Sequence, residues 1–116
     1  MPNILVIARD PDLRQSLQFA LEAEGYAVTW RPGIGAPGQL RHFDCTVVDH
    51  HALGDDWAAT LAFCVLNRPV VLLANSLVHP LSPNVFRTVL KPMLGAALSE
   101  AIRDALATQT IAPQNP

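Results

Sequence analysis

The stretch from Phe43 to Asp49 contains four consecutive apolar or β-branched residues, Cys45–Val48, which lead directly into a carboxylate. A short, unbroken apolar run of this kind is typical of a strand that is buried on both faces. Asp49 then stands where the strand leaves the sheet. In open parallel sheets, ligands and chemistry gather at the carboxyl ends of the strands. The sequence therefore predicts that Asp49 lies at the mouth of a site on which other strand ends converge.

Similar runs recur along the chain and predict four further strands, at Asn3–Ala8, Tyr26–Trp30, Val70–Ala74 and Val85–Leu90. Helical patterns lie between most of them. Alternating strands and helices with short links predict an α/β fold with a doubly wound, five-stranded parallel sheet. The length of 116 residues fits a single domain. We assign residues 1–108 to this domain and residues 109–116, which are polar and contain proline, to a flexible tail.

Capping residues and the spacing of apolar side chains predict the helices. Asp10 and Pro11 suit the start of a first helix, and Gly25 suits its left-handed end. Asp55 or Asp56 can cap a second helix that runs to about Leu66. The stripes expected to face the core are Leu13, Leu17, Ala20 and Leu21 in the first helix, and Leu94, Leu98, Ile102 and Leu106 in the last, Met93–Ala107.

The composition excludes several classes of protein. Half of the residues are hydrophobic and 16% are charged, as in a folded domain. The net charge of −2 argues against a nucleic-acid partner, which would require a basic patch. Cys45 and Cys64 lie in apolar segments, as reduced core residues do. The chain shows neither a membrane-spanning run nor a secretion signal, so we expect a cytoplasmic protein without a membrane partner.

Five pieces of sequence carry a resemblance that extends over nearly the whole chain. They are Ile4–Ile7, Asp10–Arg14, Leu21–Tyr26, Phe43-Asp44 ahead of Asp49, and Lys91-Pro92. In this order and spacing they resemble the receiver domain of bacterial two-component response regulators. The resemblance implies a flavodoxin-like fold and a signalling role in a phosphorelay rather than an enzyme. The family's second and fourth helices are expected to be shortened or lost here, since glycine and proline fill Arg31–Gly38, leaving one turn at Gln39–His42, and prolines interrupt Asn75–Asn84.

The resemblance implies that Asp49 takes the phosphoacceptor position and that Lys91 contacts the phosphoryl oxygens. The acidic pair that holds Mg²⁺ in the family falls on Ala8 and Arg9. Phosphoryl transfer brings anionic oxygens against a carboxylate, so a metal or several cations must neutralise the charge. Two fixed cations here replace an acidic cluster, and Asp10 suits a helix cap better than a metal ligand. We expect Mg²⁺ binding to be weak or absent, with Asp10 and Asp49 as the ligands if any.

The remaining departures from the family concern Arg9 and the switch positions. A guanidinium beside Asp49 can form a bidentate pair that occupies both carboxylate oxygens; the alternative is that Arg9 points to solvent. The switch hydroxyl falls on Ala74, with Ser76 as a displaced substitute, and the aromatic switch position falls on Thr88. A modified Asp49 would therefore lack the usual relay.

The leading hypothesis is an atypical receiver that works through contacts with a histidine kinase or an effector. By analogy with the family, the partner docks on Val85–Leu106, and a homodimer through that face is a further expectation. One alternative keeps Asp49 as a functional phosphoacceptor. Another is a flavodoxin-like nucleotide-binding domain or enzyme that uses the G-x-G-x-x-G loop Gly33–Gly38, although this loop follows the second strand and contains Pro37.

A metal site built from histidines is a weaker alternative. His50 and His51 follow Asp49 directly, and His42 precedes the strand. Adjacent residues on an extended loop point apart, and no helix places two of these at the spacing of one turn. The histidines are therefore expected to be loop residues near the mouth of the site.

Overall fold

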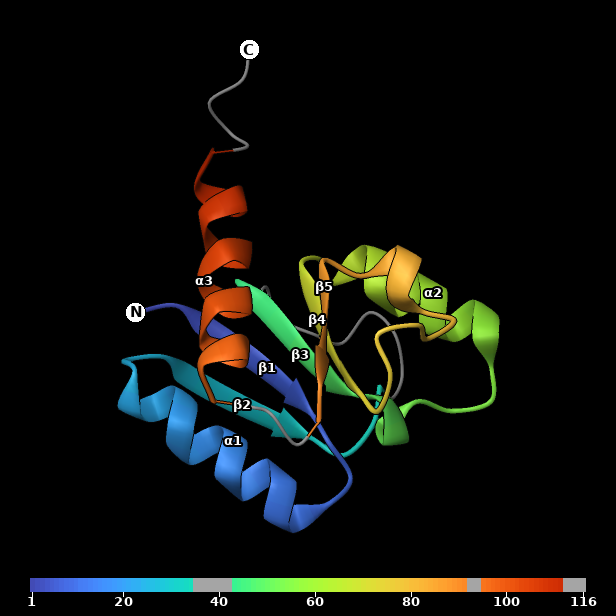
Figure 1. The fold of residues 1–116 in the computed structure, drawn as a ribbon, viewed down its shortest axis with the longest axis horizontal. Coiled ribbons are helices and arrows are strands. Elements are labelled where there is room, and N and C mark those ends of the chain that lie inside the picture. Colours follow the sequence, from blue (N-terminus) through green and yellow to red (C-terminus); the bar gives the residue numbers. More distant parts are fainter. Residues whose placement is uncertain (35–42, 92–94, 112–116) are drawn as a thin grey trace.

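The computed structural model describes residues 1–34, 43–91 and 95–111. Five strands form one parallel sheet in the order β2-β1-β3-β4-β5 (Figure 1). The strands are β1 (Asn3–Ile7), β2 (Ala27–Arg31), β3 (Cys45–Asp49), β4 (Val70–Ala74) and β5 (Arg87–Leu90). The helices are α1 (Pro11–Ala23), α2 (Trp57–Leu66) and α3 (Gly95–Ile111), with 3₁₀ turns η1 (His50–Ala52) and η2 (Ser82–Asn84). The predicted doubly wound α/β sheet is confirmed.

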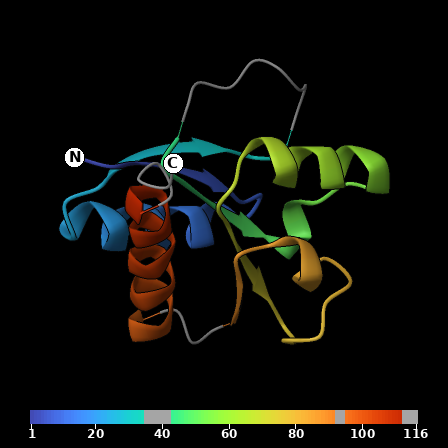
Figure 2. The same cartoon turned by 90° about the horizontal axis from the view of Figure 1, so that it is seen from above.

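Both faces of the sheet are covered, which explains why its central strands are apolar without interruption. Helices α1 and α3 pack on one face, whereas α2, η1 and η2 pack on the other (Figure 2). Alternate side chains of β1 serve the two cores: Ile4 and Val6 face α1 and α3, and Leu5 and Ile7 face α2. Strands β3 and β4 are buried at every residue. Their carboxyl ends are thereby held in fixed positions at one edge of the molecule.

Helix α1 begins and ends as its capping residues predict. The Asp10 carboxylate accepts a hydrogen bond from the N–H of Asp12 at 3.0 Å. Gly25 follows the last turn with a φ of +94°, a left-handed conformation that glycine adopts without strain. The prediction for Ala20 was wrong: it is exposed, because it lies at the edge of the face that Leu17 buries.

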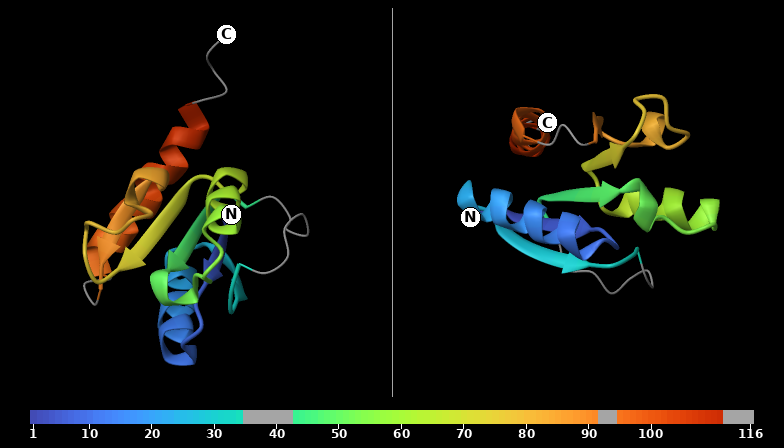
Figure 3. Two further views of the ribbon diagram at one scale, coloured as in Figure 1. Left: turned by 90° about the vertical axis from the view of Figure 1, so that its right-hand side faces the viewer. Right: turned by 60° about the horizontal axis from the view of Figure 1, so that its bottom comes forward.

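Several boundaries differ from the prediction by one to four residues. Strand β2 starts one residue later, and β5 starts at Arg87 because Val85 still closes η2. Helix α3 continues to Ile111, and its last turns extend past the ends of the strands (Figure 3). The predicted start of this helix at Met93 and Leu94, and the end of the predicted tail at residues 112–116, lie outside the described residues.

The connection from β4 to β5 contains η2 and no α-helix, as the prolines predict. This confirms the expectation, drawn from the resemblance, that the fourth helix is lost here. Ser82 holds the connection together: its hydroxyl accepts from the N–H of His79 at 3.2 Å and donates to the carbonyl of Leu77 at 3.0 Å. The predicted shortening of the second helix, with the turn at Gln39–His42, falls on residues outside the described ranges.

Candidate functional site

Asp49 and Lys91 meet at the carboxyl end of the sheet. Asp49 is the last residue of β3 and is 2% exposed. Lys91 follows β5, where its backbone N–H donates to the carbonyl of Ala74 at 2.9 Å. Its side chain then crosses the end of β4, and Nζ donates to Asp49 Oδ1 at 2.7 Å. Since the lysine side chain is only 17% exposed, this is a largely buried, charge-assisted hydrogen bond. The predicted convergence of strand ends on Asp49 is therefore observed.

A cavity of about 440 Å³ opens beside this ion pair. It is lined by Arg9, Asp10, Leu13, Asp49, His51 and Lys91. Arg9 is exposed, and Asp49 forms its ion pair with Lys91, not with Arg9. The bidentate pair that we considered from the sequence is thus absent between these two residues. The guanidinium stands at the solvent side of the cavity, where it adds positive charge without occupying the carboxylate.

The residues around the cavity do not form the acidic cluster that a hard divalent cation requires. Ala8 is fully buried in the core beneath α1 and α3. The Asp10 carboxylate caps α1, which leaves Asp49, already bonded to Lys91, as the buried carboxylate of the cavity. Within residues 1–34, 43–91 and 95–111, no group of three or more His, Cys, Asp or Glu side chains is placed to hold a metal. Mg²⁺ prefers several oxygen ligands, so this donor set does not fit it.

The three switch positions all have structural uses in this chain. Ala74 is completely buried in the core under α2 and offers no hydroxyl. Ser76 is exposed, and its Oγ accepts a hydrogen bond from the N–H of Val78 at 3.1 Å in a local turn. Thr88 Oγ1 lies 3.0 Å from Ser82 Oγ in a hydrogen bond that ties η2 to β5.

His50, His51 and His79 form a cluster next to the site. The sequence predicts that the adjacent His50 and His51 point apart. That prediction was wrong, because His50 and His51 belong to the 3₁₀ turn η1 and their ring centroids lie 4.1 Å apart. The ring of His79 meets His50 edge-on at 5.8 Å. Burial, followed by the neighbouring His51 and Lys91, lowers the pKa of His50. His79 comes from the β4–β5 connection, so no local pattern identified it; His42 lies outside the described residues.

The cysteines are buried core residues, as predicted. Cys45 packs in the core on the side of α1 and α3, whereas Cys64 packs in the core under α2. Both are free thiols, since they lie on opposite faces of the sheet. Burial raises the pKa of Cys45 to about 12 and also raises that of Cys64. A thiolate is therefore disfavoured at both positions. Most of the glycine loop Gly33–Gly38, the basis of the nucleotide-binding alternative, lies outside the described residues.

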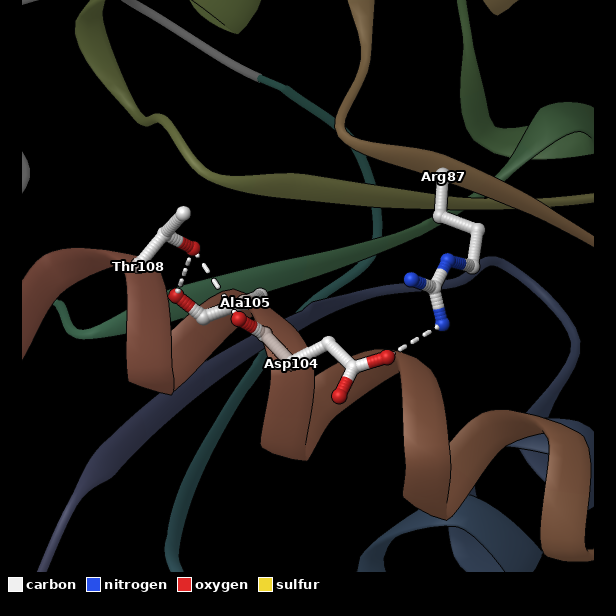
Figure 4. A network of polar contacts seen from close by, with 4 residues as sticks. All are labelled: Arg87, Asp104, Ala105 and Thr108. Carbon is white, nitrogen blue, oxygen red and sulfur yellow. Dashed lines mark hydrogen bonds and ion pairs between the residues drawn. The ribbon is translucent and has the colours of Figure 1, made fainter.

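The face expected to bind a partner is formed by β5 and α3. Figure 4 shows Arg87 of β5 reaching Asp104 of α3, with an N–O distance of 2.9 Å. On the same helix, the Thr108 hydroxyl bonds two carbonyls of the preceding turn at 2.7 and 3.0 Å. Phe86 and Leu90 are each 36% exposed along this edge of the sheet. Side chains alternate along β5, so Arg87 lies on the side of α3, whereas Leu90 lies on the other side of the sheet, with Ala74.

Solved structures show which fold this chain has. The chain is similar to the receiver domain of the sensor histidine kinase PA1611 from Pseudomonas aeruginosa PAO1, with a magnesium ion coordinated in its active site cleft. The TM-score is 0.74 at 15% identity, over 91% of this chain and 98% of that one. A two-component response regulator from Clostridium difficile gives a TM-score of 0.77 at 19% identity, over 94% and 98% of the two chains. The chain therefore has the fold of receiver domains.

A sequence relative narrows this class. The chain is 34% identical over 99 residues to the transcriptional regulator protein FixT of Rhizobium meliloti (strain 1021). The aligned region covers 83% of this chain and 85% of that protein. The chain belongs to the FixT family. No protein-family model matches it. None of the helices in the described ranges is long and apolar enough to cross a membrane.

Proposed function

We propose that this receiver domain is an atypical member of its class, which acts through contacts with a histidine kinase or an effector. In this proposal it neither requires Mg²⁺-dependent phosphorylation nor catalyses a reaction, and it works in the cytoplasm. The observation that carries the proposal is the charge of the cavity: Ala8 is buried in the core, Arg9 lines the cavity, and the 2% exposed Asp49 is bonded to Lys91 Nζ at 2.7 Å. The carboxylate that would accept a phosphoryl group is already neutralised by a side chain of the protein.

The charges around Asp49 oppose the binding of a divalent cation. Mg²⁺ at this carboxylate would have to displace or tolerate the Lys91 ammonium, and Arg9 lines the same cavity. Like charges held close together in a partly buried site repel strongly. The second carboxylate that lines the cavity, Asp10, caps α1 through a hydrogen bond from the N–H of Asp12. We therefore expect weak Mg²⁺ binding at best.

The switch positions support the same proposal. Ala74 has no hydroxyl to follow a phosphoryl group, and Thr88 is bonded to Ser82 rather than free to change its position. A conformational switch needs two arrangements of similar energy. The polar groups at these positions are satisfied in one arrangement, which favours a module that presents a constant surface to its partner.

The partner surface in this proposal is the face between Val85 and Leu106. Along the edge strand β5, Phe86 and Leu90 offer exposed apolar contact area, and the ion pair between Arg87 and Asp104 offers two charges on the side of α3. The homodimer expected from the sequence would cover this same surface, and so would compete with the partner for it.

Acetyl phosphate with Mg²⁺ tests whether Asp49 accepts a phosphoryl group. After incubation, the intact mass of the wild-type protein is compared with that of Asp49→Asn. We expect no phosphoryl adduct on either protein. An adduct that forms on the wild type and disappears in Asp49→Asn would overturn the proposal and establish the functional phosphoacceptor instead.

A Mg²⁺ titration tests the explanation based on charge. Arg9 is exposed, so Arg9→Asp should fold normally, whereas an acid at the buried Ala8 would disrupt the core. We expect Arg9→Asp to raise Mg²⁺ affinity by about tenfold, because it removes a cation from the cavity and adds an oxygen ligand. Arg31→Asp is the matched control, since Arg31 is exposed but does not line the cavity. Equal affinities for the two variants would refute this explanation.

A further inference from the structure

Helix α2 presents an apolar face to solvent. No residue of Trp57–Leu66 is charged, and its buried side chains are Thr60, Phe63 and Cys64. On the opposite side, Val65 is 59% exposed and Leu66 is 69% exposed, next to the exposed Ala58 and Ala62. A helix that is apolar on all sides is normally buried on all sides. Its outer face therefore has the composition of an interface.

The two ends of this face carry opposite charges. Asp55 and Asp56 precede the helix, and Arg68 follows it; all three are exposed. Asp56 is also the N-cap, with its Oδ1 accepting from the N–H of Ala59 at 3.0 Å. A ten-residue helix is about 15 Å long, so the acidic and basic ends lie well apart on one copy. Two copies placed antiparallel would bring the acidic end of each against the basic end of the other.

We propose that α2 is the interface of a homodimer, in which a second copy of this chain packs antiparallel across a two-fold axis near Ala62. Such an interface is self-complementary: Asp55 of each copy meets Arg68 of the other, and Ala62 faces its own copy. The small side chains at Ala58 and Ala62 let the helices approach closely, while Val65 and Leu66 supply the contact area. Because α2 lies on the other face of the sheet from α3, this dimer leaves α3 free (Figure 2).

The area that the outer face of α2 can bury limits the affinity of this dimer. A stable interface buries about 800 Å² on each partner, more than the outer face of one ten-residue helix provides. Leu77 and Val78, which are 57% and 89% exposed, lie on the β4–β5 connection, whose turn η2 packs against α2. The dimer is therefore weak, and it dissociates on dilution.

Analytical ultracentrifugation of the full chain over a range of concentrations tests the interface. We expect a monomer–dimer equilibrium for the wild type and a monomer for Ala62→Arg, which sets two arginines against each other at the axis. Ala20→Arg is the matched control, because Ala20 is an exposed alanine on α1 at the other face of the sheet. It should keep the dimer, and circular dichroism should show that both variants are folded.

Three results would overturn the interface. They are a wild type that remains monomeric at every concentration, a dimer that persists in Ala62→Arg, and a dimer that Leu90→Lys abolishes while Ala62→Arg does not. The last result would assign self-association to the exposed edge of β5.

A charge exchange tests the antiparallel arrangement separately. Arg68→Glu and Asp55→Lys should each weaken the dimer by about fivefold, since each variant loses two symmetry-related ion pairs. The double variant Asp55→Lys/Arg68→Glu should return to wild-type affinity, because the pairs re-form with their charges reversed. If the two losses add instead, the helices do not pair in this direction.

Discussion

Replacing Lys91 by methionine isolates the energetic role of the buried ion pair. Methionine keeps much of the length and the apolar stem of lysine and removes its ammonium. Asp49, 2% exposed, is then left charged without its partner. Removing one member of an enclosed pair costs about 3–5 kcal/mol. The lysine side chain is 17% exposed and borders an open cavity, so water relieves part of this penalty, and we expect a loss of about 2–3 kcal/mol.

Urea denaturation measures this loss as a shift of the midpoint at constant slope. For a domain of this size the loss corresponds to a fall in Tm of about 10 °C. Asp49→Asn should cost only about 1 kcal/mol, because the remaining ammonium can turn into the cavity and stay hydrated. The double variant Asp49→Asn/Lys91→Met should lose less than the two single variants together, with a coupling of about 1–2 kcal/mol.

Two results would refute this reasoning. One is a Lys91→Met protein as stable as the wild type, and the other is a double variant in which the single losses simply add. Either result would mean that Lys91 and Asp49 are close without stabilising each other. The ion pair would then not hold the site in one arrangement, as the proposed function requires.

Three further measurements test other parts of the structure. Ser82→Ala removes the hydroxyl bonded to Thr88 at 3.0 Å, so we expect a stability loss of about 1 kcal/mol and faster amide exchange in η2, measured by mass spectrometry. Burial lowers the pKa of the His50 imidazole from 6.5 in the folded protein. The imidazole therefore binds a proton more readily in the unfolded state, and the folded state loses stability as the pH falls through 6.5. His50→Gln should therefore lose less stability than the wild type between about pH 7 and pH 5 in parallel urea titrations. With a pKa of about 12, Cys45 should resist thiol reagents until the protein is unfolded, and rapid labelling of the native protein would contradict its burial.

The elements that the sequence predicts well are those with local physical signals. Strands β1, β3 and β4 are continuous apolar runs because both of their faces are buried. Asp10 and Gly25 mark the ends of α1 because each satisfies the backbone at its own position. Proline likewise excludes a regular helix between β4 and β5. In each case the residues that decide the structure are neighbours in the chain.

The site is less accessible from the sequence because its contacts join distant segments. The resemblance to receiver domains places Asp49 and Lys91 together, but the sheet order is needed for Lys91 to reach across the end of β4. Arg9 has a long side chain at the surface, and no local signal decides whether it turns inward or outward. The contact of His79 with His50 depends on the path of the β4–β5 connection.

The Asp49–Lys91 ion pair and the β4–β5 connection both favour a single arrangement of the site. Lys91 neutralises the carboxylate that a phosphoryl group would modify, and the bond between Thr88 and Ser82 holds the adjoining connection in place. Under the proposed function, a receiver held in one arrangement carries information through its presence and its contacts. Its binding to a partner should therefore survive Asp49→Asn, apart from the small loss of stability, and should fail when Leu90→Lys alters the face of β5. A receiver that signals through phosphorylation would show the opposite dependence, with binding governed by Asp49.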